Sequence, residues 1–216
     1  MKTPVLEILY ADDDVIAFNK PAGLLSVPGK GPDKQDCLIN RAIAQYPNSR
    51  SVHRLDMATS GIILIPQSHY CLSEISKQFQ NRTIEKSYTA IIEGRLTNQS
   101  GEIDLPLICD WPNRPKQMVS YDNGKPSKTL FEVDSYTEFG SEKLQSTRVI
   151  LTPITGRSHQ LRVHMQVLGH SILGDNFYAT GKALSASSRL LLHATKLIFT
   201  HPVNARRIEI DCPPDF

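Results

Sequence analysis

Three chemically different side chains lie within four positions of the sequence: His53, Arg54 and Asp56. An apolar run at residues 62–65 follows and predicts a buried strand that begins at Gly61. Charged groups at the end of a buried strand lose hydration unless they are paired. Asp56 is therefore either one half of an Arg–Asp ion pair or a functional carboxylate, as a nucleophile or a general base.

A nucleophilic aspartate must stay ionised near neutral pH. A nearby cation favours the ionised form of Asp56, whereas burial opposes it. Arg54 is close in sequence, but residues i and i+2 of an extended segment share a face only roughly. Arg157, at the start of an expected helix, is the better candidate partner for Asp56.

Other chemistries find little support in the sequence. His53 and Asp56 suggest acyl transfer, but no Gly-x-Ser-x-Gly motif or catalytic cysteine supplies a nucleophile. His159 and His164 are five residues apart and so occupy different helix faces, unlike the two histidines of zinc proteases. The four cysteines form no Cys-x-x-Cys pair, and glycine-rich phosphate motifs are absent. We expect no metal, no cofactor and no disulfide framework.

Size and composition indicate an ordinary globular protein. The chain has 216 residues, of which 40% are hydrophobic and 21% are charged. We expect no membrane association, because no apolar run reaches the ~18–20 residues of a membrane span. Residues 1–5 have no apolar signal-peptide region, so we expect a cytoplasmic protein. The net charge of +2 does not by itself demand a nucleic-acid partner.

Hydrophobic periodicity predicts short strands and few helices. Leu38, Ala42, Ile43 and Tyr46 have helical spacing, and Pro47 ends that helix. A second helical stripe comprises Leu72, Ile75, Ser76 and Phe79. A third helix is expected, with Ser158 as its N-cap. Its buried stripe contains Leu161, Met165 and Leu168. Its polar face contains His159, Arg162 and Gln166. Strands are expected at residues 5–9, 15–19, 61–65, 86–92, 103–107, 129–136, 147–151, 190–194 and 208–210. This mixture predicts an α+β fold with a largely antiparallel sheet.

Two further aromatic residues have both a structural and a functional interpretation. Trp111, Arg114 and Lys116 lie on a loop braced by prolines, where they could stack on nucleic acid and pair with its phosphates. Trp111 could equally fasten the loop to the body of the protein. Tyr88 shares a strand face with Ala90, and a core position is the default interpretation for a tyrosine on a strand.

Residues 53–61, His-Arg-Leu-Asp-Met-Ala-Thr-Ser-Gly, closely resemble the His-Arg-Leu-Asp-x-x-Thr-Ser-Gly signature of RluA-type pseudouridine synthases. Other segments resemble further motifs of that family in the same order, so that the resemblance covers essentially the whole chain. They are residues 19–24, 86–90, 155–164, 168–175 and 192–194. Residues 109–116 and the short N-terminal region resemble the dual-specificity subgroup.

The resemblance implies an isomerase that converts uridine into pseudouridine in RNA. Its expected substrates are a 23S ribosomal RNA loop and a transfer RNA anticodon stem-loop. The expected fold is the α+β pseudouridine synthase catalytic fold, with a mixed, largely antiparallel sheet, flanking helices and a central cleft. We expect residues 1–216 to form a single catalytic domain without an S4 RNA-binding domain. The expected protein is a monomer.

The resemblance also implies roles for individual residues. Asp56 would attack the target uridine, Tyr88 would stack on the flipped base, and Arg157 would pair with Asp56. Arg54 would fill the place of the flipped nucleotide, whose extrusion costs a few kcal/mol. The remaining residues expected on the substrate side are His53, Thr59, Arg162, Trp111, Arg114 and Lys116.

Two competing hypotheses come from other functional classes. The first is a catalytically silent RNA-binding module on the same scaffold, against which the presence of Asp56, Tyr88 and Arg157 argues. The second is an unrelated aspartate-dependent hydrolase, for which the sequence lacks an evident second carboxylate or base motif.

Overall fold

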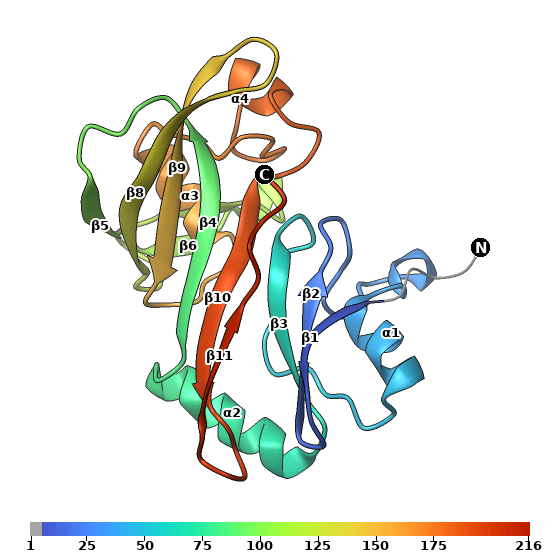
Figure 1. Cartoon of the computed structure of the whole chain (residues 1–216). Coiled ribbons are helices and arrows are strands. Elements are labelled where there is room, and N and C mark those ends of the chain that lie inside the picture. Colours follow the sequence, from blue (N-terminus) through green and yellow to red (C-terminus); the bar gives the residue numbers. More distant parts are fainter. Residues whose placement is uncertain (1–5) are drawn as a thin grey trace. The chain divides into compact units, whose positions relative to one another are not determined.

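The computed structural model describes residues 6–216, which form two compact units (Figure 1). The first unit contains residues 6–86 together with His193–Asp215, and the second contains Ser87–Leu192 with Phe216. Val5, the first residue of the strand expected at 5–9, lies outside the described residues. Within residues 6–216, no helix is both long and apolar enough to cross a membrane.

The first unit is organised around a sheet with the strand order β1-β2-β3-β10-β11. Neighbouring strands are antiparallel except for β3 and β10, which run parallel. Every residue of β3 is buried, as its unbroken apolar sequence predicts. The strand bounds are β1 (Glu7–Ala11), β2 (Val15–Lys20), β3 (Ser60–Pro66), β10 (Leu192–Thr200) and β11 (Arg207–Asp211).

Two α-helices belong to the first unit: α1 (Leu38–Gln45) and α2 (His69–Asn81). Ser68 caps α2, because its side chain accepts a hydrogen bond from the backbone N–H of Cys71 at 3.1 Å. Ile75 of α2 is buried in a core with side chains of β2, β3, β10 and β11. A short 3₁₀ helix, η1 (Pro32–Lys34), lies in the loop before α1.

The second unit has an antiparallel sheet with the order β4-β9-β8-β5 and a separate hairpin, β6-β7. Its helices are α3, which contacts β7, β8 and β9, and the short α4. The strand bounds are β4 (Glu85–Glu93), β5 (Ser100–Asp104), β6 (Leu107–Cys109), β7 (Gln117–Val119), β8 (Lys128–Phe139) and β9 (Leu144–Pro153). The helix bounds are η2 (Trp111–Asn113), α3 (Gln160–Val167) and α4 (Gly181–Ser185).

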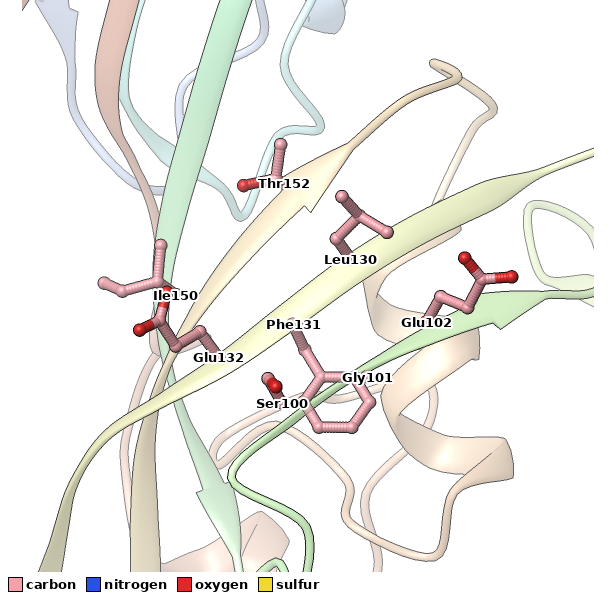
Figure 2. Close-up of a pocket in the computed structure, with 8 residues that line it drawn as sticks. All are labelled: Ser100, Gly101, Glu102, Leu130, Phe131, Glu132, Ile150 and Thr152. Atoms are coloured by element: carbon pink, nitrogen blue, oxygen red, sulfur yellow. The ribbon is translucent and has the colours of Figure 1, made fainter.

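Strands β5, β8 and β9 line a cavity of about 450 Å³ (Figure 2). Its lining residues are Ser100, Gly101, Glu102, Leu130, Phe131, Glu132, Ile150 and Thr152. None of the site residues predicted from the sequence, all of which are described, belongs to this lining. The candidate chemistry therefore lies elsewhere in the protein.

The expected α+β class with a largely antiparallel sheet is confirmed, but several strand boundaries were wrong. The strand expected at 5–9 runs from Glu7 to Ala11. The strand expected at 103–107 is interrupted: β5 ends at Asp104 and β6 begins at Leu107. Pro106 lies between them and has no N–H to donate to a strand ladder. The strand expected at 190–194 begins at Leu192 and continues to Thr200.

Details of two helices also differ from the prediction. Ile43 is 41% exposed, and Ile39 takes the buried position on α1. Ser158 does not cap α3, because His159 in the left-handed conformation is the N-cap. On the same helix Leu168 is 38% exposed, whereas Arg162 is buried at 2% exposure rather than lying on a polar face. A charged partner in the second unit explains this burial of Arg162.

Candidate active site

The two neighbours of Asp56 are held through their backbone atoms. The hydroxyl of Ser26 donates to the carbonyl of Leu55 at 2.7 Å and accepts from the N–H of Leu55 at 3.0 Å. On the other side, the N–H of Gly23 donates to the carbonyl of Met57 at 2.8 Å. The loop after β2 thus fixes the backbone on both sides of Asp56. Two glycines and two prolines at residues 21–29 give this loop its irregular course.

Lys20, the last residue of β2, adds a buried cation to this arrangement. Its ammonium donates to the carbonyl oxygens of Pro21 at 3.0 Å, Leu24 at 2.8 Å and Met57 at 3.1 Å. These three acceptors match the three N–H donors of an ammonium group. Burial lowers the pKa of Lys20 to about 7, and the negative charge of Asp56 opposes that shift. Lys20 therefore holds the backbone next to Asp56 and also interacts electrostatically with its carboxylate.

The residues after Asp56 form a turn into β3. The N–H of Thr59 donates to the carbonyl of Asp56 at 3.1 Å, and Thr59 is 3% exposed. Ser60 Oγ lies 2.8 Å from Nδ1 of His193 on the parallel strand β10. Thr59 therefore takes part in this turn, and its contact with RNA stays a prediction.

Gly61 has a steric reason to be glycine. Its φ is +107°, and a Cβ built there would lie 2.3 Å from the carbonyl oxygen of Ala194 on β10. Both the left-handed φ and the close approach of β10 exclude a side chain. The Thr-Ser-Gly part of the motif at residues 59–61 therefore places the strand that follows Asp56.

His53 and Arg54 occupy different environments. Nε2 of His53 accepts a hydrogen bond from the backbone N–H of Leu64 at 2.8 Å, and its ring lies 4.8 Å from the ring of Phe79. Burial and, to a smaller extent, the positive charge of Lys86 lower the pKa of His53 to about 3. His53 is therefore a neutral support of β3, and its expected place on the substrate side stays a prediction. Arg54 is exposed, as a residue that reaches toward RNA has to be.

In the second unit, Arg157 is an exposed residue of the turn before α3. Its Nε donates to the carbonyl of Pro126 at 3.2 Å. Its backbone N–H donates to Oε1 of the buried Gln160 at 3.0 Å, so the turn is fixed by a core side chain.

Tyr88 is half-buried near the beginning of β4 and pairs in register with Leu151. It is not a fully buried core residue.

The loop between β6 and β7 presents an aromatic ring to solvent. Trp111 is 64% exposed, and the guanidinium of Arg114 lies over its ring at 4.7 Å. Backbone hydrogen bonds from Asp110 N–H to the carbonyl of Lys116 and from Lys116 N–H to the carbonyl of Asn113 close the loop. The exposure of Trp111 argues against a fastening to the body, and its stacking on nucleic acid stays a prediction.

Arg162 and His164 of α3 are inside the unit. Arg162 forms a bidentate ion pair with Asp175, with Nε–Oδ2 and Nη2–Oδ1 distances of 2.7 and 2.6 Å. The expectation that Arg162 lies on a polar helix face is therefore wrong, because the side chain is 2% exposed, and its contact with RNA stays a prediction. His164 Nδ1 lies 2.9 Å from Thr129 Oγ1, and burial lowers the pKa of His164. His164 is thus a satisfied structural histidine, as its spacing from His159 indicates.

Asp56 belongs to the first unit, whereas Tyr88 and Arg157 belong to the second. The convergence of these three side chains therefore stays a prediction.

Lys20 was missed as a site residue, although it lies in the Asn-Lys-Pro segment of the sequence. A lysine at the end of an apolar strand and before a proline-glycine loop was the signal that could have found it.

A family model described as RNA pseudouridylate synthase matches residues 14–167. The chain belongs to this family. The predicted family, the fold and the enzyme class, an isomerase that forms pseudouridine in RNA, are confirmed.

Curated relatives of this synthase have closely similar sequences. The chain is 49% identical over 213 residues to the dual-specificity RNA pseudouridine synthase RluA of Escherichia coli K12, covering 99% of this chain and 95% of the relative. It is 49% identical over 209 residues to the protein of the same name from Yersinia pestis, covering 97% and 99%. The corresponding Vibrio parahaemolyticus protein is 50% identical, with coverage of 99% and 85%.

Solved structures of the family resemble the synthase in fold. Human RNA pseudouridylate synthase domain containing 1 is 25% identical with a TM-score of 0.83, covering 100% of this chain and 87% of the human chain. Human RNA pseudouridylate synthase domain containing 4 is 26% identical with a TM-score of 0.74, with coverage of 97% and 89%.

Proposed function

We propose that this protein converts specific uridines into pseudouridine in two kinds of RNA, a 23S ribosomal RNA loop and a transfer RNA anticodon stem-loop. The relatives at 49–50% identity have the name dual-specificity RNA pseudouridine synthase, which supports a double substrate range. The resemblance of residues 109–116 to the dual-specificity subgroup supports the choice of these two RNAs.

In the proposed reaction Asp56 is the nucleophile. Its carboxylate attacks the target uridine, and the carbon–nitrogen glycosidic bond breaks. The uracil turns, and a carbon–carbon glycosidic bond forms as the bond to Asp56 breaks. The uracil carbon that forms this bond loses its proton, the former glycosidic nitrogen gains one, and the carboxylate of Asp56 is released unchanged. The reaction needs no cofactor, because the nucleoside is neither oxidised nor reduced and gains no group from outside.

One observation carries this proposal: the backbone on both sides of Asp56 is fixed. Leu55 is bonded at both its N–H and its carbonyl to Ser26, and the carbonyl of Met57 is bonded by Lys20 and Gly23. A nucleophile gains most of its effect when it is held in a reactive orientation before substrate arrives. An aspartate that served only as a surface charge would not require such support.

The other roles complete the proposal. Tyr88 stacks on the flipped uracil, and Arg157 pairs with Asp56 and keeps it ionised. Arg54 enters the base stack and replaces the extruded nucleotide, which offsets part of the unstacking cost. These roles require the two compact units to form one catalytic domain with a central cleft. We propose that residues 1–216 do so, in a monomer that works in the cytoplasm.

On the substrate side, we propose that the loop at residues 110–116 binds RNA. Exposed Trp111 offers a ring face, Arg114 lies over that ring, and Lys116 adds a third group suited to nucleic acid. Modest net charge is compatible with this role when basic groups concentrate on the RNA-binding surface.

The substitution Asp56→Asn tests the proposal and separates it from a silent RNA-binding module. We expect it to abolish pseudouridine formation in both RNAs while binding of the stem-loop stays within about twofold of wild type. Pseudouridine mapping of total RNA from cells with and without each variant measures the first, and filter binding the second. Full modification by the Asp56→Asn protein would refute the nucleophilic role. Binding without modification by the wild-type protein would favour the silent module.

A further inference from the structure

Three chain segments of the second unit meet at the hydroxyl of Tyr178. The backbone N–H of Gln117, the first residue of β7, donates to this hydroxyl at 2.8 Å. On its other side, the hydroxyl lies 2.7 Å from Nδ1 of His159, the N-cap residue of α3. The Tyr178 oxygen accepts from Gln117, and its bond to His159 can form with either tautomer of the imidazole, because a hydroxyl both donates and accepts. The tyrosine joins β7 to the beginning of α3.

His159 is held in a conformation that non-glycine residues rarely adopt. Its φ is +53°, in the left-handed region, immediately before the first turn of α3. Its ring stacks on Phe177 with a centroid distance of 5.5 Å and an interplanar angle of 17°, and it meets the edge of Tyr178 at 5.6 Å. These two rings stabilise the backbone turn that begins two residues earlier, at Arg157.

The two rings are in turn fixed by the buried ion pair between Arg162 and Asp175. Oδ1 of Asp175 also accepts hydrogen bonds from the N–H groups of Phe177 at 2.9 Å and Tyr178 at 3.2 Å. The guanidinium of Arg162 lies over the same rings at 5.1 and 5.2 Å. Burial leaves Arg162 and Asp175 2% and 0% exposed, so the carboxylate depends on these charge-assisted bonds.

The Tyr178 hydroxyl thus connects two parts of the proposed site. Gln117 directly follows Lys116, which closes the loop that carries Trp111 and Arg114. His159 follows Arg157 by two residues. The ring of Tyr178 is 8% exposed and packs with Leu107 and Val163, so the position of its hydroxyl is fixed by the core.

We propose that Tyr178 is a positioning residue: its hydroxyl sets the RNA-binding loop and Arg157 at a fixed spacing, so that RNA bound on Trp111 and Arg114 is aligned with the reacting groups. This inference rests on the proposed function of that loop. Without the hydroxyl, the loop and the α3 turn still exist, but they are no longer joined at this point.

The first test compares Tyr178→Phe with Tyr136→Phe. Both substitutions keep the ring and remove a hydroxyl of the second unit. The Tyr136 hydroxyl accepts from Gln99 and donates to the carbonyl of Leu96, both at 2.8 Å, and neither partner belongs to residues 110–117 or 157–159. Tyr178→Phe is expected to lower kcat/KM for a folded stem-loop about tenfold, mainly through KM, while Tyr136→Phe leaves it within about twofold. Equal kinetics for the two variants would overturn the inference.

A double-mutant cycle with Trp111→Ala tests whether Tyr178 acts through the loop. If it does, Tyr178→Phe should have little further effect on KM once the indole has been removed. Full additivity would point to a general structural role and would contradict the proposal. Should Trp111→Ala alone leave KM unchanged, the proposed function of the loop fails, and the inference fails with it. Impairment by Trp111→Ala with none by Tyr178→Phe refutes the inference only.

A pair of substitutions at His159 keeps the proposal testable if Tyr178→Phe does not fold. Asparagine tolerates the left-handed conformation and offers an amide that can donate to or accept from the Tyr178 hydroxyl, whereas alanine offers neither group. His159→Asn is therefore expected to keep KM closer to the wild-type value than His159→Ala. The opposite order, or identical KM values, would contradict a role of the Tyr178–His159 bond in RNA alignment.

Discussion

The segment around Asp56 and the loop around Trp111 are held in contrasting ways. Backbone atoms on both sides of Asp56 are bonded by buried groups, including the ammonium of Lys20 and the hydroxyl of Ser26. Trp111 is 64% exposed, and its ring is contacted by the side chain of Arg114. The first arrangement fixes direction, whereas the second leaves a surface open to a partner.

This difference follows from what each region has to do in the proposed reaction. A nucleophile loses rate steeply when its orientation drifts, so its support has to come from the rigid backbone. Groups that stack on bases and approach phosphates gain affinity from exposure, and they act on many related RNA surfaces. Substitutions near Asp56 should therefore affect folding or kcat, and substitutions near Trp111 should affect RNA affinity.

The largest effect is expected from Gly61→Ala compared with Gly169→Ala. At Gly61 a Cβ would lie 2.3 Å from the carbonyl oxygen of Ala194, whereas nothing lies within 4 Å at Gly169. Both glycines have positive φ, so the comparison isolates the steric clash. We expect Gly61→Ala to lower the free energy of unfolding by about 3 kcal/mol or more, and Gly169→Ala by about 1 kcal/mol. Urea unfolding measures both. Equal losses would show that β10 yields easily and that the Asp56 region is less rigid than we infer.

The next effect is expected from Lys20→Met, which removes three hydrogen bonds to carbonyl oxygens near Asp56. We expect kcat to fall about tenfold or more, with little change in RNA affinity, because the nucleophile is less well aimed. Lys86→Met is the matched control. Lys86 is also a lysine whose pKa is lowered by burial, but its ammonium lies over the ring of Phe79 at 5.9 Å. A loss confined to affinity would contradict the proposed role of Lys20.

Lys20 also predicts a pH dependence of stability. Its pKa is about 7 in the folded protein and 10.5 as an ordinary lysine, so the folded state binds fewer protons between these values. The free energy of unfolding should therefore rise with pH across this window. In the Lys20→Met variant this contribution to the slope of unfolding free energy against pH should be absent.

The sequence predicted the parts of the molecule that depend on neighbours in the chain. The apolar run at 62–65 identified β3, and the motif at residues 53–61 identified the segment that contains Asp56. It missed partners that meet only through folding. Nothing in the sequence near Arg162 indicates that Asp175 holds it inside the unit, so its charge suggested an exposed face.

The start of α3 shows the same limit at the level of the backbone. Ser158 has the side chain that usually caps a helix, and local preference therefore favours it. The observed N-cap is His159, whose left-handed conformation is stabilised by rings from Phe177 and Tyr178. A tertiary contact outweighs the local preference, and such contacts have no periodicity that a sequence pattern can reveal.

A smaller effect is expected on the RNA-binding loop, from Trp111→Ala and Arg114→Ala. Each should weaken stem-loop binding by about 1–2 kcal/mol without changing the free energy of unfolding, because both side chains are exposed. Arg114→Ala should also reduce the dependence of affinity on salt by about one counterion, whereas Trp111→Ala should leave it unchanged. Binding titrations at several salt concentrations measure both effects. A fall in kcat with unchanged affinity would remove the contrast between the two regions.

The smallest effect is expected from His53→Gln, and it depends on pH. The pKa of His53 is about 3 in the folded protein, whereas its ordinary value is 6.5. Between these pH values the folded state therefore binds fewer protons than the unfolded state. Stability should therefore be fully present above pH 6.5 and decrease as the pH falls toward 3. Glutamine can still accept from the N–H of Leu64 but does not titrate, so the variant should show a shallower decrease in urea unfolding experiments. The exposed His69→Gln variant should keep the wild-type slope. Identical slopes for all three proteins would mean that protonated His53 is tolerated beside β3, and the Asp56 segment would then be less tightly packed than its contacts indicate.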